Sequence, residues 1–196
     1  LYLITALGKT GKLDAARTAL GTAIERFTEF RTLTDSAEAS LAFAARDAGL
    51  SPEALEHIAN AIHTRERSRA TSADNTLSEW YSVYAGMLGV AGHEDDAVEA
   101  AGASIVACGE NQPLREQRFK ELTNVLGRMR DLDGWLGRYD ARAKESGVDA
   151  PILRKALASV MRDTGAMESA AKQLRLAIAL DPRDLSTYRD LLAVLD

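Results

Sequence analysis

The sequence predicts an all-α protein built from stacked antiparallel helix pairs, and three observations indicate this fold class. Apolar residues recur at the 3.6-residue period of amphipathic helices along the chain. Alanine-rich runs favour helix, and each of the four prolines stands where a helix can begin or end. Glycines fall where a first helix would turn into a second, at Gly11, Gly49, Gly92 and Gly165. At 196 residues, the chain has room for about five such pairs.

Residues 151–184 carry the clearest copy of the helix pair. Small residues stand where the two helices would cross, Ala158 on the first and Ala170 on the second, and they allow the backbones to approach closely. Gly165 permits the tight turn between the helices, and Pro182 cannot continue the second helix. This segment therefore serves as the reference for the other repeats.

The order of small and large residues resembles the tetratricopeptide (TPR) repeat, a helix-turn-helix unit of 34 residues. The resemblance implies a right-handed superhelical solenoid in which residues 1–196 form a single domain. Its approximate repeats are 1–30, 35–70, 74–110, 113–147 and 151–184, followed by a terminal helix at 185–196. The fourth repeat departs most from the pattern, because its turn is shortened and Trp135, Leu136 and Tyr139 replace the usual second-helix residues.

Composition and charge narrow the class of protein. The 24 Lys and Arg residues against 29 Asp and Glu give a net charge of -5, so we expect no nucleic-acid partner. The single cysteine, Cys108, lies in an apolar run and is expected to be a buried, inert thiol. No apolar run is long enough to span a bilayer and no signal peptide is visible, which favours the cytoplasm and no membrane partner. The chain opens at Leu1 inside a helical pattern, which indicates a fragment of a longer protein.

No catalytic or metal-binding motif stands out, so we expect no enzyme active site, no cofactor and no metal. His57 and His63 are six residues apart and do not share a helix face as an i, i+4 ligand pair would. The run 93–96 is an acidic helix start, which needs no metal.

Aromatic residues and glycines in the third repeat allow two interpretations. Trp80, Tyr81 and Tyr84 form either a stacking platform or part of the core, and their helical spacing favours the core. Gly86 and Gly89 are expected to be close-packing sites within a helix rather than parts of a phosphate loop.

The resemblance also implies a binding surface. In the TPR family the first helix of each pair lines a concave groove, with repeat positions 2, 5, 9 and 12 pointing inward. Carried over, these positions are Ser36, Ala39, Phe43 and Arg46 in the second repeat, Glu79, Ser82, Gly86 and Gly89 in the third, Ile152, Lys155, Ser159 and Arg162 in the fifth, Arg189 in the last helix, and Lys120, Thr123 and Arg130 in the irregular fourth. The candidate partner-binding residues are Phe43, Arg46, Lys120, Arg130, Lys155, Ser159, Arg162 and Arg189.

Charge divides along the chain. Residues 1–110 hold 9 basic and 16 acidic side chains, whereas residues 111–196 hold 15 and 13. One hypothesis is that Lys120, Arg130, Lys155, Arg162 and Arg189 line a positive groove for an acidic partner segment. The alternative is that they are ordinary solvated charges.

These patterns predict a protein–protein interaction scaffold that binds a protein or peptide segment. The Lys and Asn clamp of the chaperone-binding TPR proteins is absent, so a chaperone adaptor is not expected. An alternative is a regulatory or substrate-presenting domain attached to an enzyme elsewhere in the full-length chain. Self-association through the end helices is a third possibility that the sequence leaves open.

Overall fold

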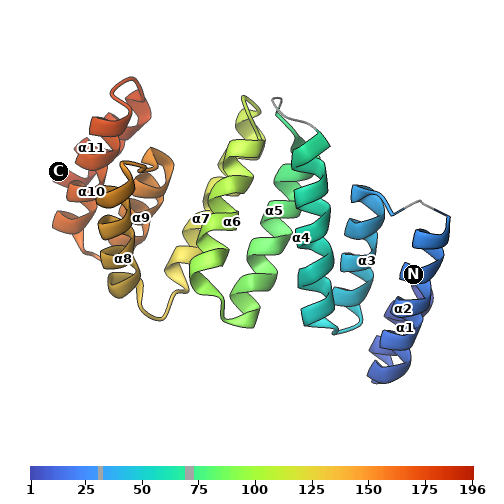
Figure 1. Cartoon of the computed structure of the whole chain (residues 1–196). Helices are drawn as coiled ribbons and strands as arrows, with labels where there is room; N and C mark the ends of the chain where they lie inside the picture. Colours follow the sequence, from blue (N-terminus) through green and yellow to red (C-terminus); the bar gives the residue numbers. More distant parts are fainter. Residues whose placement is uncertain (31–32, 69–72) are drawn as a thin grey trace. The chain divides into compact units, whose positions relative to one another are not determined.

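The computed structural model describes residues 1–30, 33–68 and 73–196, and these residues form eleven helices and no strand (Figure 1). The helices are α1 (Tyr2–Lys9), α2 (Leu13–Glu29), α3 (Asp35–Asp47), α4 (Ser51–Ser68), α5 (Asn75–Ala91), α6 (Glu94–Ala107), α7 (Gln112–Gly127), α8 (Leu132–Ser146), α9 (Pro151–Asp163), α10 (Met167–Leu180) and α11 (Leu185–Leu195). The all-α prediction is confirmed. The predicted end of the second repeat, residue 70, lies outside the described residues.

Backbone contacts divide the chain into two compact units, an N-terminal unit of Leu1–Glu110 and a C-terminal unit of Asn111–Asp196. The unit boundary falls where the charge balance of the sequence changes sign. A single continuous solenoid stays a prediction.

Polar side chains cap the starts of five of the described helices. Side-chain oxygens of Thr34, Asp74, Asn111, Asp131 and Asp184 each accept a hydrogen bond from a backbone N–H two or three residues further on. These bonds satisfy donors that have no partner inside the helix. The helix starts are therefore encoded locally.

The predicted turn glycines adopt the backbone conformation that the turns require. Gly92 closes α5 at φ 85° and ψ 11°, a left-handed conformation that costs other residues a clash at Cβ. The other three turn glycines also have positive φ: Gly11, Gly49 and Gly165. The turn positions read from the sequence are confirmed.

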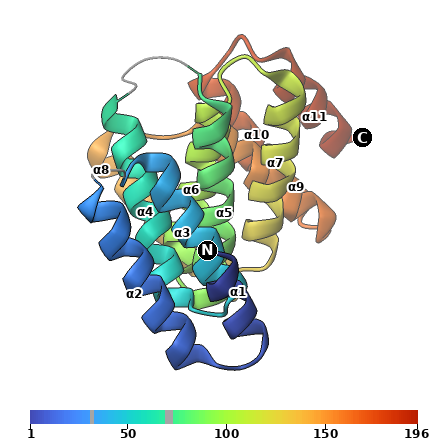
Figure 2. The ribbon, with the colours of Figure 1, turned by 90° about the vertical axis from the view of Figure 1, so that its right-hand side faces the viewer.

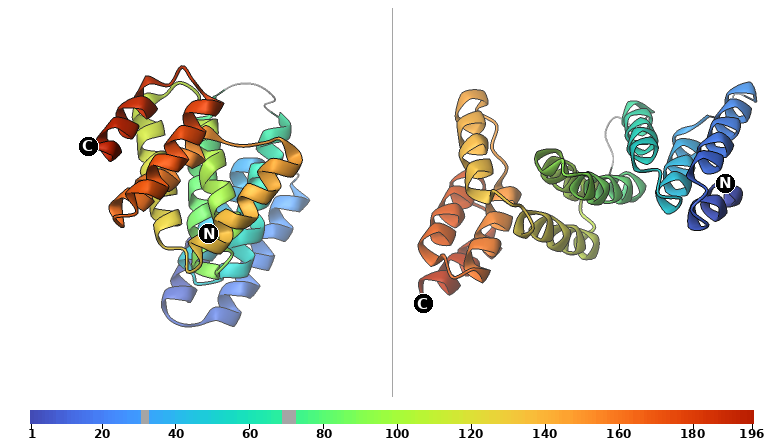
Figure 3. Two further views of the ribbon diagram at one scale, coloured as in Figure 1. Left: turned by 90° about the vertical axis from the view of Figure 1, so that its left-hand side faces the viewer. Right: turned by 90° about the horizontal axis from the view of Figure 1, so that it is seen from below.

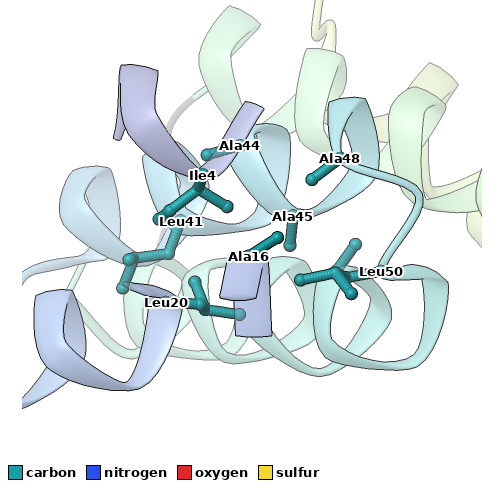
Figure 4. Close-up of a cluster of buried hydrophobic side chains, with 9 residues drawn as sticks. Ile4, Ala16, Leu20, Leu41, Ala44, Ala45, Ala48 and Leu50 are labelled. Carbon is teal, nitrogen blue, oxygen red and sulfur yellow. The ribbon is translucent and has the colours of Figure 1, made fainter. Parts of the chain in front are cut away.

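The core of the first four helices is made of large apolar side chains set among alanines (Figure 4). Ile4 of α1, Leu20 of α2 and Leu41 of α3 meet there, each no more than 2% exposed. The helices α1 and α2 run side by side as an antiparallel pair (Figure 2) and both contact α3. A side chain at Gly8 would collide with the backbone of Ala48, so α1 and α3 approach closely there.

A second cluster joins α3, α4 and α5. Ala42 and Ala61 are fully buried where α3 and α4 cross, and Ile58 fills the space beside them. Trp80 of α5 closes the cluster at 5% exposure, as predicted for a core residue. Tyr81 and Tyr84 pack against it only in part.

The C-terminal unit is built around α9 and α10, with α11 against α10 (Figure 3). Ala158 and Ala170 lie at the crossing, 2% and 0% exposed, as the sequence predicted. The fourth repeat differs from the regular hairpin, because α7 makes its main backbone contacts with α9 rather than with α8. Leu136 of α8 packs instead on the α9–α10 cluster, which draws α8 away from α7.

Candidate partner-binding groove

The N-terminal unit contains an open pocket of about 420 Å³ between the end of α3, the start of α4 and the C-terminal half of α5. It is lined by Arg46, Ser51, Val83, Gly86, Met87, Val90 and Ala91. Two of these residues, Arg46 and Gly86, occupy inward positions predicted from the sequence on two successive first helices. The structure therefore brings predicted groove positions of the second and third repeats to one cavity.

One wall of the pocket is an apolar face of α5. Val83, Gly86 and Val90 recur at i, i+3 and i+7, and Val90 is 90% exposed. In the part of the chain that the structure describes, no atom beyond the helix's own neighbouring backbone lies within 4 Å of the place where a Cβ would stand on Gly86 or Gly89. The expectation that these glycines are close-packing sites is therefore wrong, because the space beside them is open. Val83, Met87 and Val90 were missed from the sequence, although they neighbour the inward positions.

Among the described residues, Arg46 of α3 is the charged residue that lines the pocket. The guanidinium carbon of Arg46 lies 5.3 Å from the centre of the Phe43 ring. The guanidinium nitrogens Nε and Nη2 donate hydrogen bonds of 3.0 and 2.8 Å to Asp47 Oδ1. Phe43 is half-buried against the α3–α4–α5 cluster, so the cation stands on a supported aromatic surface. Arg46 is 45% exposed, so its pairing with Asp47 leaves part of the side chain accessible to solvent.

In the C-terminal unit, Lys155 has an internal role. Its Nζ donates to Asp184 Oδ2 at 2.8 Å and to Ser186 Oγ at 2.7 Å, and its side chain is 14% exposed. Burial by itself would raise the pKa of Asp184, but hydrogen bonds from Lys155, Ser186 and Thr187 outweigh burial and hold that pKa well below its usual value. Lys155 thus fastens the start of α11 to α9, and its charge is already compensated.

The remaining predicted residues lie on three helices and one turn. Ser159 and Arg162 share a face of α9 with Lys155; Ser159 is half-buried, whereas Arg162 is exposed and 3.3 Å from Asp163. Three further predicted cations are exposed: Lys120 on α7, Arg130 in the turn after it, and Arg189 on α11.

Two buried polar pairs were missed by the sequence analysis, and they occupy equivalent places. Glu38 of α3 lies 2.6 Å from His57 of α4, and Arg154 of α9 donates to Gln173 of α10 at 2.9 Å. In each pair the two residues are 19 positions apart, the first eleven residues before the turn glycine and the second eight residues after it. The signal in the sequence was a charged residue, Glu38 or Arg154, at position 4 of its repeat, on a helix face whose other residues are apolar.

Arg154 is the centre of the larger of these networks and is 3% exposed. Its guanidinium donates to Asp149 at 2.8 to 3.0 Å and to Asp140 at 2.6 Å, and it stacks 4.8 Å from the centre of the Tyr139 ring. Burial and a hydrogen bond to Asp149 raise the pKa of Tyr139 to about 12. The network ties α8 and the loop after it to α9 and α10.

Among the described residues, no group of three or more His, Cys, Asp and Glu side chains is arranged to hold a metal ion. None of the helices in these residues has the length and apolar character needed to cross a bilayer. Cys108 is 1% exposed, and its Sγ donates to the Ser104 carbonyl at 3.2 Å, so the burial expected for this thiol is confirmed.

The helix pairs and the pocket that they enclose define an all-α protein of repeat-like architecture. No known family model matches the sequence, and no curated protein matches it either.

Proposed function

We propose that this chain is a TPR-like interaction scaffold whose first helices form the inner face of a right-handed solenoid and hold a segment of a partner protein. The observation that carries the proposal is the 420 Å³ pocket, because Arg46 and Gly86 were placed on the inner face from repeat position alone and line the same cavity. An apolar wall accompanied by a few polar groups, here Arg46 and Ser51, is typical of a recognition pocket. The proposed role is binding, without catalysis.

The pocket chemistry describes the segment that fits. Val83, Met87 and Val90 offer apolar area to a large apolar side chain of the partner, whose burial stabilises the complex by about 25 cal/mol per Å². Arg46 at the rim favours a carboxylate close to that side chain. In the C-terminal unit, the exposed cations Arg162 and Arg189 would likewise favour acidic residues of a partner.

Gly86→Leu is the variant that tests the groove. The space around a Cβ at Gly86 is open and Gly86 lines the pocket, so a leucine there should occupy pocket volume, and it also favours the helix. Gly137→Leu is the matched control, because Gly137 is an exposed glycine of α8 with equally open surroundings. Peptides are selected from a random displayed library on the unaltered chain, and their affinities for both variants are measured by fluorescence anisotropy.

The proposal predicts peptides that combine apolar and acidic residues and bind Gly86→Leu at least tenfold more weakly than Gly137→Leu. Selected peptides that bind both variants equally well, or a selection that yields no binder, would refute the groove. Lys155 is unsuitable for such a test, because its replacement breaks the contact with Asp184 and disturbs α11.

A further inference from the structure

A pocket of about 280 Å³ lies between α5 and α6, apart from the groove described above. It is lined by Tyr81, Tyr84, Asp96, Glu99, Ala100 and Ala103. Tyr81 and Ala100 are the counterparts in this helix pair of Glu38 with His57 and of Arg154 with Gln173, since they stand eleven residues before and eight after Gly92. The small Ala100 cannot reach across as His57 and Gln173 do, so the place that a polar pair fills elsewhere is open here.

The described residues that line the pocket include two carboxylates, Asp96 and Glu99, and no cation. Asp96 and Glu99 are exposed, and within the described residues neither carboxylate has an ion-pair partner. Residues 73–110 contain no lysine or arginine, against seven acidic side chains: Asp74, Glu79, Glu94, Asp95, Asp96, Glu99 and Glu110. Asp74 is paired with Arg65 of α4, whereas Asp96 and Glu99 line the pocket itself, and the field of these two carboxylates favours a positive ligand.

The tyrosines supply the aromatic walls. Both rings are half-buried, and the Tyr81 hydroxyl donates to Glu66 of α4, which fixes that ring. Burial, followed by the charge of Asp96, raises the pKa of Tyr84. Burial, the hydrogen bond to Glu66 and the charges of Glu66 and Glu99 raise the pKa of Tyr81. Both hydroxyls stay protonated, and the carboxylates lie close enough to the rings to act on the same bound group.

Elsewhere in the chain, two arginines each lie against an aromatic ring and two carboxylates. The guanidinium of Arg65 lies 5.1 Å from the centre of the Trp80 ring, and that of Arg154 lies 4.8 Å from the Tyr139 ring. Each is also paired with two aspartates, Asp35 and Asp74 for the first and Asp140 and Asp149 for the second. The α5–α6 pocket has the aromatic rings and the two carboxylates but lacks the arginine. A planar guanidinium suits such a site better than a lysine ammonium, because it stacks on rings and pairs with carboxylates at once.

We propose that the α5–α6 pocket binds an arginine side chain presented by an exposed segment of a partner protein. The guanidinium stacks on Tyr81 or Tyr84 and pairs with Asp96 and Glu99. This site goes beyond the proposed groove, uses different residues and does not depend on it.

The test uses a short acetylated and amidated Gly-Arg-Gly peptide as the probe, with citrulline and lysine versions for comparison. Binding to the full chain is followed by NMR, through the ring resonances of Tyr81 and Tyr84. We expect saturable shifts with the arginine peptide, an affinity on the order of millimolar, weaker binding of the lysine peptide and none of the neutral citrulline peptide. The double variant Asp96→Asn/Glu99→Gln should lose at least tenfold in affinity, since both charges are removed from an exposed surface without disturbing the core.

Glu25→Gln/Glu29→Gln is the matched control, because it removes the same charge from exposed positions of α2 and should bind as the unaltered chain does. Unfolding curves that coincide with that of the unaltered chain establish that both double variants are folded. The proposal is overturned if the arginine peptide leaves the two rings unshifted, if citrulline or lysine binds equally well, or if the Asp96→Asn/Glu99→Gln variant keeps its affinity. Gly86→Leu should leave these shifts unchanged, so the groove and this pocket can fail separately.

Discussion

Arg154→Met is predicted to destabilise the C-terminal unit strongly. Methionine retains an apolar stem but removes every donor that the guanidinium supplies, and loss of one partner of a buried ion pair costs about 3 to 5 kcal/mol. In this variant Asp140, which is 42% exposed, can be hydrated in place of its lost partner. Asp149 is 17% exposed and Gln173 is 2% exposed, so water cannot fully replace the guanidinium for these two residues. The expected loss is therefore about 3 kcal/mol, at the low end of that range.

Urea unfolding followed by the fluorescence of Trp135 measures this loss. Trp135 is buried and stacked 5.2 Å from Tyr139, so it reports on the C-terminal unit, and Trp80→Phe in both proteins removes the other indole. With a denaturant slope of about 1 to 1.5 kcal/mol/M, the midpoint should fall by roughly 2 to 3 M.

Arg162→Met is the control for Arg154→Met, because Arg162 lies on the same helix with 43% of its side chain exposed. It should change the unfolding free energy by no more than about 0.5 kcal/mol. Adding Asp149→Asn to Arg154→Met should restore about 1 kcal/mol by removing the orphaned charge. Equal stabilities for Arg154→Met and Arg162→Met would refute the reasoning that the network holds α8 to α9 and α10.

Two further predictions concern pH and the turns. The pKa values of Asp149 and Asp184 are lower in the fold than in the unfolded chain, so the stabilisation from these groups is fully present above the unfolded pKa of about 4 and is lost as pH falls through the folded values. Urea midpoints of the C-terminal unit should therefore decline below about pH 5. A midpoint that is constant down to about pH 3 would contradict this prediction. Gly92→Ala should cost about 1 to 2 kcal/mol, because Gly92 caps the end of α5 with φ at +85°. Gly86→Ala, inside α5, should be neutral or stabilise by up to about 1 kcal/mol, and equal melting temperatures of the two variants by circular dichroism would count against the turn argument.

Much of the fold could be predicted because its signals are local. Capping side chains such as Thr34 and turn glycines such as Gly92 act within a few residues of themselves, so the sequence is enough to place them. The burial of Ala158 and Ala170 follows from helical spacing in the same way. The fourth repeat was harder, because the choice of α7 between α8 and α9 depends on the whole α9–α10 surface.

The candidate site was predictable only in part. Repeat position brought Arg46 and Gly86 to one pocket, yet Val83 and Val90 emerged only once the exposed face of α5 was known. Lys155 shows the limit most clearly, since its position on α9 suggested a ligand contact and its actual partner, Asp184, lies 29 residues away.

By itself, the sequence determined the all-α class, the approximate helix and turn positions and which residues are small enough to lie at crossings, since these depend on backbone preference and helical period. Only the tertiary structure decided which charges are compensated inside the chain and which are open to a partner. The reason is physical: the energy of a charge depends on every group within a few ångströms of it, and those groups come from distant parts of the sequence.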